Sequence, residues 1–245
     1  MIELVLVEGV SDVQLISYYM QSVYEWKHVN ENILGITVLD AHEHIENLTK
    51  GDNELVLCGV GGNSKFASFV EKHRINAMII EKEIASFMVV TDRDKESNLK
   101  MTRRINAVFE NITFEAGKWV KNKIADGYGQ DKLVNTYLLI IPENENGALE
   151  SVIINALKDI PEEKELMQEV IDFIDNVKND LVPELCKINK YNKAVVGTFF
   201  SVRNPENAMR SFGAFVSKVE WLKSESLKQI FMPLGCLGKE KTINN

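Results

Sequence analysis

Acidic side chains follow two short apolar runs of this chain, and their spacing suits them to chemistry. Glu8 ends the run I-E-L-V-L-V-E with Asp12 four residues further on, and Asp92 and Asp94 end the run S-F-M-V-V-T-D-R-D. Short apolar runs bounded by turn residues are typical of buried strands in a parallel sheet. Ligands bind at the carboxyl ends of such strands. A pocket of carboxylate oxygens there indicates a hard divalent cation.

The acids differ in what their positions imply. Asp92 and Asp94 are two residues apart, so in extended backbone both side chains point the same way and could share one metal or hold two. Glu8 is followed by Gly9, which places it in a sharp turn where ligands approach the sheet. Asp12 falls in the first turn of the next helix, where it could hold metal or favour the positive helix end. The alternative for Asp92 and Asp94 is a solvated turn, where Asp is common because it caps helices.

The elements that must position these acids alternate between strand and helix. The patterns predict strands over 2–7, 36–39, 54–58, 86–92 and 136–141, and helices over 11–20, 64–75 and 97–109. Such alternation predicts an α/β fold in which a parallel sheet is flanked by crossover helices.

A change of organisation follows Pro142, because all five prolines lie at or after it. From Pro161 onward the pattern is almost wholly helical, with helices expected over 162–177, 181–188 and 193–200. We therefore expect a boundary near Asp159–Pro161. It separates an α/β domain over 1–159 from a mainly helical C-terminal extension over 160–245 that packs on it.

The order of these motifs resembles the Toprim domain. A strand followed by E-G-x-x-D, then, about eighty residues later, a strand followed by D-x-D, is similar to the metal-binding core of topoisomerases, bacterial primases, OLD-family nucleases and small ribonucleases that mature ribosomal RNA. The resemblance covers roughly residues 1–145. It implies a Toprim-like (Rossmann-like) fold in which Glu8 is an acid–base or metal-linked group and Asp92 and Asp94 hold Mg²⁺. Asp12 matches the additional acid of primase-like and OLD-like members.

Two further matches resemble OLD-like nucleases. Gly147-Ala148-Leu149-Glu150 is similar to their small-residue-Leu-Glu signature, which makes Glu150 a ligand for a second metal. Lys193 resembles a downstream lysine that neutralises phosphate charge. The alternatives are an acid at a helix N-terminus and a solvated lysine. The chain also resembles uncharacterised bacterial Toprim-related proteins, which imply no activity.

Three weaker signals concern phosphate and zinc. The turn G-V-G-G-N-S-K, residues 59–65, matches no phosphate-loop motif and predicts a tight turn into a helix, or a turn whose Lys65 contacts a nucleic-acid phosphate. Lys118, Lys121 and Lys123 flank Trp119 and indicate either a strand-binding groove or a solvated helix face. His42-Glu43-His44 lacks a third ligand and is interpreted as a polar loop, not a zinc site.

Composition limits the class of protein. The net charge of −8 argues against a basic protein that coats nucleic acid, but leaves room for a nuclease. Cys58, Cys186 and Cys236 are far apart, which predicts buried thiols in a reducing compartment, with no disulfide or zinc. The first apolar run is far shorter than the roughly 20 residues of a membrane span. We therefore expect a cytoplasmic protein without a membrane partner.

These observations predict a Mg²⁺-dependent nuclease that hydrolyses phosphodiesters of DNA or RNA. No room remains for an ATPase domain, so an ATPase partner would be a separate polypeptide. The alternative is a catalytically silent Toprim-fold module that binds a partner protein or nucleic acid. A third interpretation is a Rossmann-like domain whose acids only cap turns.

Overall fold

The computed structural model describes residues 1–207 and 212–239 of the chain. They form two compact units, described separately below. Unit 1 comprises Met1–Ile140 with the described part of Pro233–Asn245, and unit 2 comprises Ile141–Met232. The chain has an α/β fold with a helical C-terminal part.

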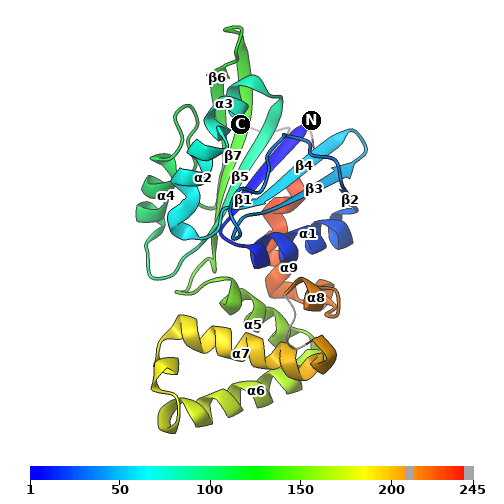
Figure 1. Cartoon of the computed structure of the whole chain (residues 1–245), viewed down its shortest axis with the longest axis vertical. Coiled ribbons are helices and arrows are strands. Elements are labelled where there is room, and N and C mark those ends of the chain that lie inside the picture. Colours follow the sequence, from blue (N-terminus) through cyan, green and yellow to red (C-terminus); the bar gives the residue numbers. More distant parts are fainter. Residues whose placement is uncertain (208–211, 240–245) are drawn as a thin grey trace. The chain divides into compact units, whose positions relative to one another are not determined.

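Unit 1 is built on one seven-stranded sheet with the strand order β2-β3-β4-β1-β5-β7-β6 (Figure 1). β1 is central and fully apolar along Leu4–Val7, which are 0% exposed. The strands are β1 (Ile2–Val7), β2 (Lys27–Val29), β3 (His44–Lys50), β4 (Asn53–Gly59), β5 (Ile84–Asp92), β6 (Trp119–Ala125) and β7 (Asp131–Ile141).

The sheet is parallel at its centre and antiparallel toward its edges. β1 pairs in parallel with β4 on one side and β5 on the other. β3 pairs antiparallel with β2 on one side and with β4 on the other, and β6 pairs antiparallel with β7. The edges differ from the expected all-parallel sheet because short turns can join only antiparallel neighbours. Gly51, with φ 56°, lies in the two-residue turn between β3 and β4.

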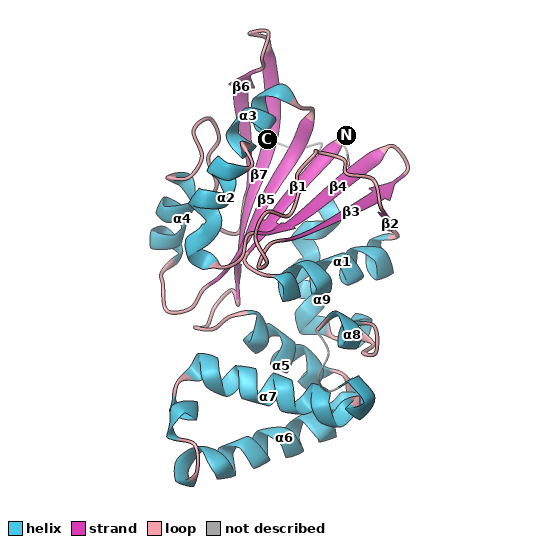
Figure 2. Cartoon of the chain, viewed as in Figure 1, coloured by secondary structure: helices cyan, strands magenta, loops and turns pink. Residues whose placement is uncertain are grey.

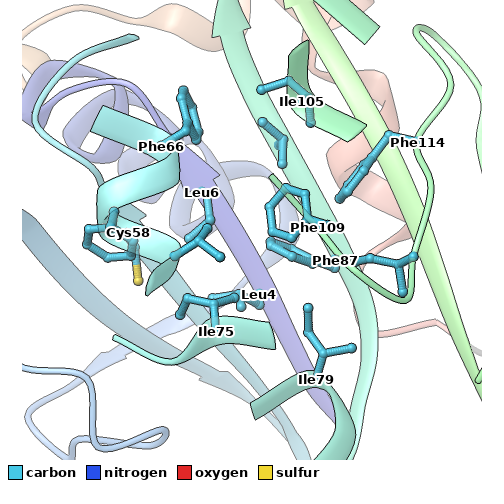
Figure 3. Packing of buried hydrophobic residues seen from close by; sticks show 14 of the residues in the cluster. Leu4, Leu6, Cys58, Phe66, Ile75, Ile79, Phe87, Ile105, Phe109 and Phe114 are labelled. Atoms are coloured by element: carbon cyan, nitrogen blue, oxygen red, sulfur yellow. The ribbon is translucent and has the colours of Figure 1, made fainter. Parts of the chain in front are cut away.

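Helices cover both faces of this sheet (Figure 2). α1 (Val10–Tyr24) packs against β3 and β4. α2 (Phe66–Lys72), α3 (Ile75–Glu81) and α4 (Asn98–Asn106) cover a second hydrophobic layer. Alternate residues of β1 and β5 point into that layer, where the Phe87 ring meets Phe109 at 5.1 Å and Phe114 at 5.5 Å. Figure 3 labels the layer at Leu4, Leu6, Cys58, Phe66, Ile75, Ile79, Phe87, Ile105, Phe109 and Phe114.

A C-terminal segment, Pro233–Lys239, returns to unit 1 and packs beside β1; we call it the clasp. The amide of Gly238 donates to Glu3 Oε1 over 3.0 Å, and Asn53 Nδ2 donates to the Gly238 carbonyl over 3.0 Å. Gly238 has φ 71°, and an added Cβ would lie 2.9 Å from the Trp26 ring. Both facts require glycine there.

Unit 2 is helical. α5 (Leu149–Asp159) packs against α6 (Pro161–Asp180), α7 (Ile188–Arg203) and α9 (Glu225–Phe231), and α8 (Gly213–Val216) is short. The buried Glu163 of α6 accepts from Arg203 of α7 through both carboxylate oxygens. The expected boundary at Asp159–Pro161 thus falls within this unit, because α5 belongs with the helices that follow it. The helix expected over 181–188 is only a 3₁₀ turn, Pro183–Cys186.

Three segments of unit 1 differ from the sequence-based expectations. Residues 36–39 form a loop, in which Ile36 is buried while Val38 and Leu39 are exposed. Residues 119–123 belong to strand β6, not to a helix face. Glu43 lies in the loop before β3, as expected, but it is a buried acid that accepts from Lys72 and His73.

Candidate acidic site at the ends of β1 and β5

The parallel pairing of β1 and β5 brings two of the predicted site residues together. Leu6 is in register with Val89, so the ends of both strands lie at the same edge of the sheet. Glu8 Oε1 accepts two hydrogen bonds from the end of β5, from Thr91 Oγ1 over 2.6 Å and from the amide of Asp92 over 2.9 Å. Side chain and backbone thus join the two acidic strand ends directly.

Glu8 is 9% exposed, and its surroundings affect its protonation. Burial raises the pKa of the Glu8 carboxyl most strongly, because a charged group loses hydration there. The bonds from Thr91 and Asp92 act in the opposite direction, the charge of Asp94 raises the pKa, and Arg104 lowers it. The net direction is upward. Since Oε1 already accepts two hydrogen bonds, a proton on this group belongs on Oε2.

Asp12 is buried within the turn between β1 and α1. Its Oδ2 accepts from the amide of Gly9 over 2.9 Å, and α1 begins at Val10 with Gly9 as its N-cap, one residue before the helix start expected at residue 11. β4 approaches this turn closely, because an added Cβ on Gly59 would lie 3.0 Å from the Gly9 carbonyl oxygen. Asp12 therefore stabilises the turn that carries Glu8.

Asp92 and Asp94 have different backbone conformations. Asp92 is the last residue of β5, whereas Asp94 lies beyond the strand in the left-handed region with φ 49°. The alternation rule for extended backbone therefore does not apply to this pair. Asp94 still acts on Glu8, whose pKa its charge raises.

Sequence reasoning did not identify Thr91 and Arg104 as members of this site. Thr91 is 1% exposed and donates to Glu8, while Arg104 Nη2 lies 3.5 Å from Thr91 Oγ1 and its Nη1 donates to Glu96 over 3.0 Å. The one signal was a hydroxyl residue inside an otherwise apolar run, directly before the acid.

The donor set suits a hard cation that retains water. Within residues 1–207 and 212–239, no three His, Cys, Asp or Glu side chains are placed so that together they could hold a metal ion. Mg²⁺ is usually held by only one or two carboxylates, with waters and substrate phosphates completing its shell. The carboxylates at the ends of β1 and β5 are oxygen ligands of the kind that Mg²⁺ takes.

Glu150 and Lys193 lie in unit 2 and are neighbours there. Glu150 is in the first turn of α5, and its Oε1 lies 3.9 Å from Lys193 Nζ of α7. The Lys193 side chain is 70% exposed. Beside them Ser151 Oγ accepts from the buried Asn192 over 2.9 Å, at the edge of a pocket of about 210 Å³. The other four predicted ligands, at positions 8, 12, 92 and 94, belong to unit 1.

The predicted nucleic-acid-binding lysines are dispersed over unit 1. Lys65 ends the 3₁₀ turn Asn63–Lys65 after β4, where it is exposed. Lys118 pairs with Glu115 at 3.0 Å and Lys123 pairs with Asp131 at 2.6 Å, while Lys121 is exposed on β6. Lys123 lies opposite Leu133, near the start of β7, where Asn135 contacts Ala85 at the beginning of β5. Lys123 is therefore at the end of the sheet where β5 begins, whereas Asp92 is at the end where β5 finishes.

The fold and the site define an α/β protein with a buried glutamate at the carboxyl ends of its central parallel strands. The chain belongs to a family described as protein of unknown function (DUF3226), which it matches over residues 2–232. It is similar to the crystal structure of a hypothetical protein from Pyrococcus horikoshii OT3, with a TM-score of 0.55, 14% identity and 96% of each chain covered. That likeness concerns the fold alone. No curated protein matches the chain.

No helix in the described part of the chain is both long and apolar enough to cross a membrane. Cys58 is a buried free thiol, Cys186 an exposed one and Cys236 a partly exposed one.

Proposed function

We propose that the protein is a Mg²⁺-dependent nuclease that hydrolyses phosphodiester bonds of DNA or RNA at the ends of β1 and β5. The observation that carries the proposal is the pair of hydrogen bonds from Thr91 and Asp92 to Glu8. They bring two acid-bearing strand ends to one edge of the sheet, where α/β folds bind ligands. The resemblance of the E-G-x-x-D and D-x-D motifs to the Toprim domain supports the same assignment.

Each acid has a separate role in this proposal. Asp92 and Asp94 would hold Mg²⁺, with Mn²⁺ as a substitute, and the chemistry that this ion would supply is stabilisation of charge on phosphate oxygens. Glu8 holds or moves a proton at Oε2, because Oε1 is occupied and burial raises the pKa of the carboxyl. Asp12 fixes the turn that carries Glu8 and can add a further oxygen ligand.

Glu150 and Lys193 enter the proposal through their resemblance to OLD-like nucleases. Glu150 would hold a second metal, and Lys193 would neutralise phosphate charge. Their 3.9 Å separation is compatible with either role or with a surface ion pair. The same resemblance makes a separate ATPase polypeptide a proposed partner, and the three free thiols suit the cytoplasm.

The test is cleavage of plasmid, single-stranded DNA and RNA in Mg²⁺ or Mn²⁺. We expect Asp92→Asn to lower the rate by about 100-fold or more, and EDTA to abolish it. Asp52→Asn is the matched control, because Asp52 is an exposed acid in the turn before β4, at the opposite edge of the sheet. Cleavage that survives Asp92→Asn would refute this site.

The same experiment separates the second candidate function, a catalytically silent module that binds nucleic acid or a partner protein. Such a module would bind without cleaving under any metal condition. If calorimetry then shows that the wild-type protein binds metal and that Asp92→Asn does not, the acidic site would be a metal site that does not catalyse cleavage.

A further inference from the structure

The segment that follows β5 concentrates positive charge in an otherwise acidic chain. Residues 93–104 carry five Lys and Arg side chains against two acids, a net charge of +3, whereas the whole chain carries −8. These five cations follow directly after Asp92, in the connection to α4 and on α4 itself. They are Arg93, Lys95, Lys100, Arg103 and Arg104, and we call them the α4 cationic surface.

Two of the five cations are held by one acid. Glu96 accepts from Lys100 at 2.5 Å and from Arg104 at 3.0 Å. Glu96 therefore occupies these two cations much as a phosphate oxygen could.

Lys95 and Arg103 differ, because neither forms an ion pair with any residue that the structure describes. Both side chains are exposed, and Arg103 lies one helical turn from Leu99, which is 61% exposed on the same face of α4. Exposed cations beside an acidic site allow a polyanion to approach carboxylates that would otherwise repel it.

We propose that the α4 cationic surface binds the sugar–phosphate backbone of a nucleic-acid strand beside the acids of β1 and β5. Lys95 and Arg103 contact phosphates directly, while Lys100 and Arg104 exchange Glu96 for phosphate oxygens. The inference rests on the proposed function only in naming that strand as the substrate.

The lysines on β6 and just before it suit this role less well. Lys118 and Lys123 already have acidic partners, and Lys123 lies at the opposite edge of the sheet. Lys121 is exposed on the same strand and forms no ion pair among the described residues, which makes it the matched control for Arg103.

The test measures binding without cleavage. Fluorescein-labelled 20-nucleotide single strands of DNA and of RNA are titrated with the protein in EDTA, between 50 and 300 mM salt, and anisotropy is recorded. Each phosphate contact contributes about 0.7 to the salt slope of a single strand, which is roughly fourfold in affinity at 0.15 M salt. We expect Lys95→Ala/Arg103→Ala to weaken binding about 15-fold and to lower the slope by about 1.4. Lys121→Ala should leave affinity within about twofold of wild type.

Glu96→Gln gives the opposite sign. The substitution removes a competing negative charge while keeping the shape, so we expect binding to tighten by about two- to fivefold. A misfolded variant would not bind more tightly, so this result cannot arise from damage to the fold. Wild-type protein that binds neither strand, or binding that depends on Lys121 and not on Lys95 and Arg103, would overturn the inference. If the variants change binding as expected but the protein cleaves nothing in Mg²⁺, the nuclease proposal would be refuted. The α4 cationic surface would then still be a nucleic-acid-binding surface.

Discussion

Replacing Thr91 by Val tests the hydrogen bond on which the acidic site depends. Thr91 is 1% exposed and donates to Glu8 Oε1 over 2.6 Å. Valine has nearly the same shape and is also β-branched, so it leaves no cavity in β5. A hydrogen bond to a charged group contributes about 1.5–3 kcal/mol, and a neutral one about 1 kcal/mol. We therefore expect a loss of about 2 kcal/mol in the free energy of unfolding at pH 8, where more of Glu8 is ionised than at lower pH.

The loss should shrink as the pH falls. The bond from Thr91 lowers the pKa of Glu8, so its removal raises that pKa further and penalises the ionised form. At pH 5, where more Glu8 is protonated, the loss should approach about 1 kcal/mol. Wild-type Glu8 has a folded pKa above its ordinary 4.5, so its contribution to stability is full below that value and declines as the pH rises through the folded pKa.

Urea unfolding between pH 5 and 8 in EDTA measures both effects. Thr136→Val is the matched control, because Thr136 is 0% exposed and donates to the neutral carbonyl of Thr113, so its cost should not vary with pH. In a Glu8→Gln background the pH dependence of Thr91→Val should disappear. A loss for Thr91→Val that is the same at pH 5 and pH 8 would refute our account of how Glu8 is held.

Two further predictions concern the sheet that carries the site. Phe87→Ala should cost about 3–5 kcal/mol in urea unfolding, because Phe87 is 0% exposed between two other rings; Phe173→Ala, 55% exposed on α6, should stay within about 0.5 kcal/mol. Gly59→Ala should cost about 1–3 kcal/mol, since its Cβ would press on the Gly9 backbone, while Gly127→Ala, with open space around it, should be nearly neutral in thermal unfolding. Equal effects of the two glycine substitutions would contradict the close approach of β4 to the turn after β1.

The central strands could be predicted because their local sequence patterns agree with their burial in the fold. Leu4 to Val7 and Val56 to Cys58 are apolar runs closed by glycine or acid, and a buried parallel strand is the structure such a run favours. Ser97 likewise has a side chain that accepts from the amide of Lys100, as expected of a residue that begins a helix.

The edge strands could not be predicted in the same way. β3 reads H-I-E-N-L-T-K and β6 reads W-V-K-N-K-I-A, so polar residues interrupt both patterns. In β6 the buried Asn122 bonds to Thr113 and Thr136, which lie 9 and 14 residues away. Such partners come from tertiary structure and leave no local signal.

At the candidate site, the sequence identified the acids but not the groups that hold them. Glu8 and Asp92 stand out because each follows an apolar run. The role of Thr91 depends on the register of β1 against β5, which spacing along the chain does not reveal. The left-handed backbone of Asp94 could not be predicted either. Asp is one of the residues that adopt this conformation, so no glycine marks the position in the sequence.

The clasp has a consequence for how the protein is made. Unit 1 is discontinuous, since unit 2 is inserted between β7 and Pro233. During synthesis the buried carboxylate of Glu3 and the ring of Trp26 must wait for Gly238, which emerges more than two hundred residues later. β1 thus acquires its full set of neighbours only after unit 2 has been made. Expression of 1–140 alone would therefore yield an unfinished domain, whereas an internal deletion that joins 233–239 directly to β7 would keep Glu3, Trp26 and Gly238 in one continuous domain.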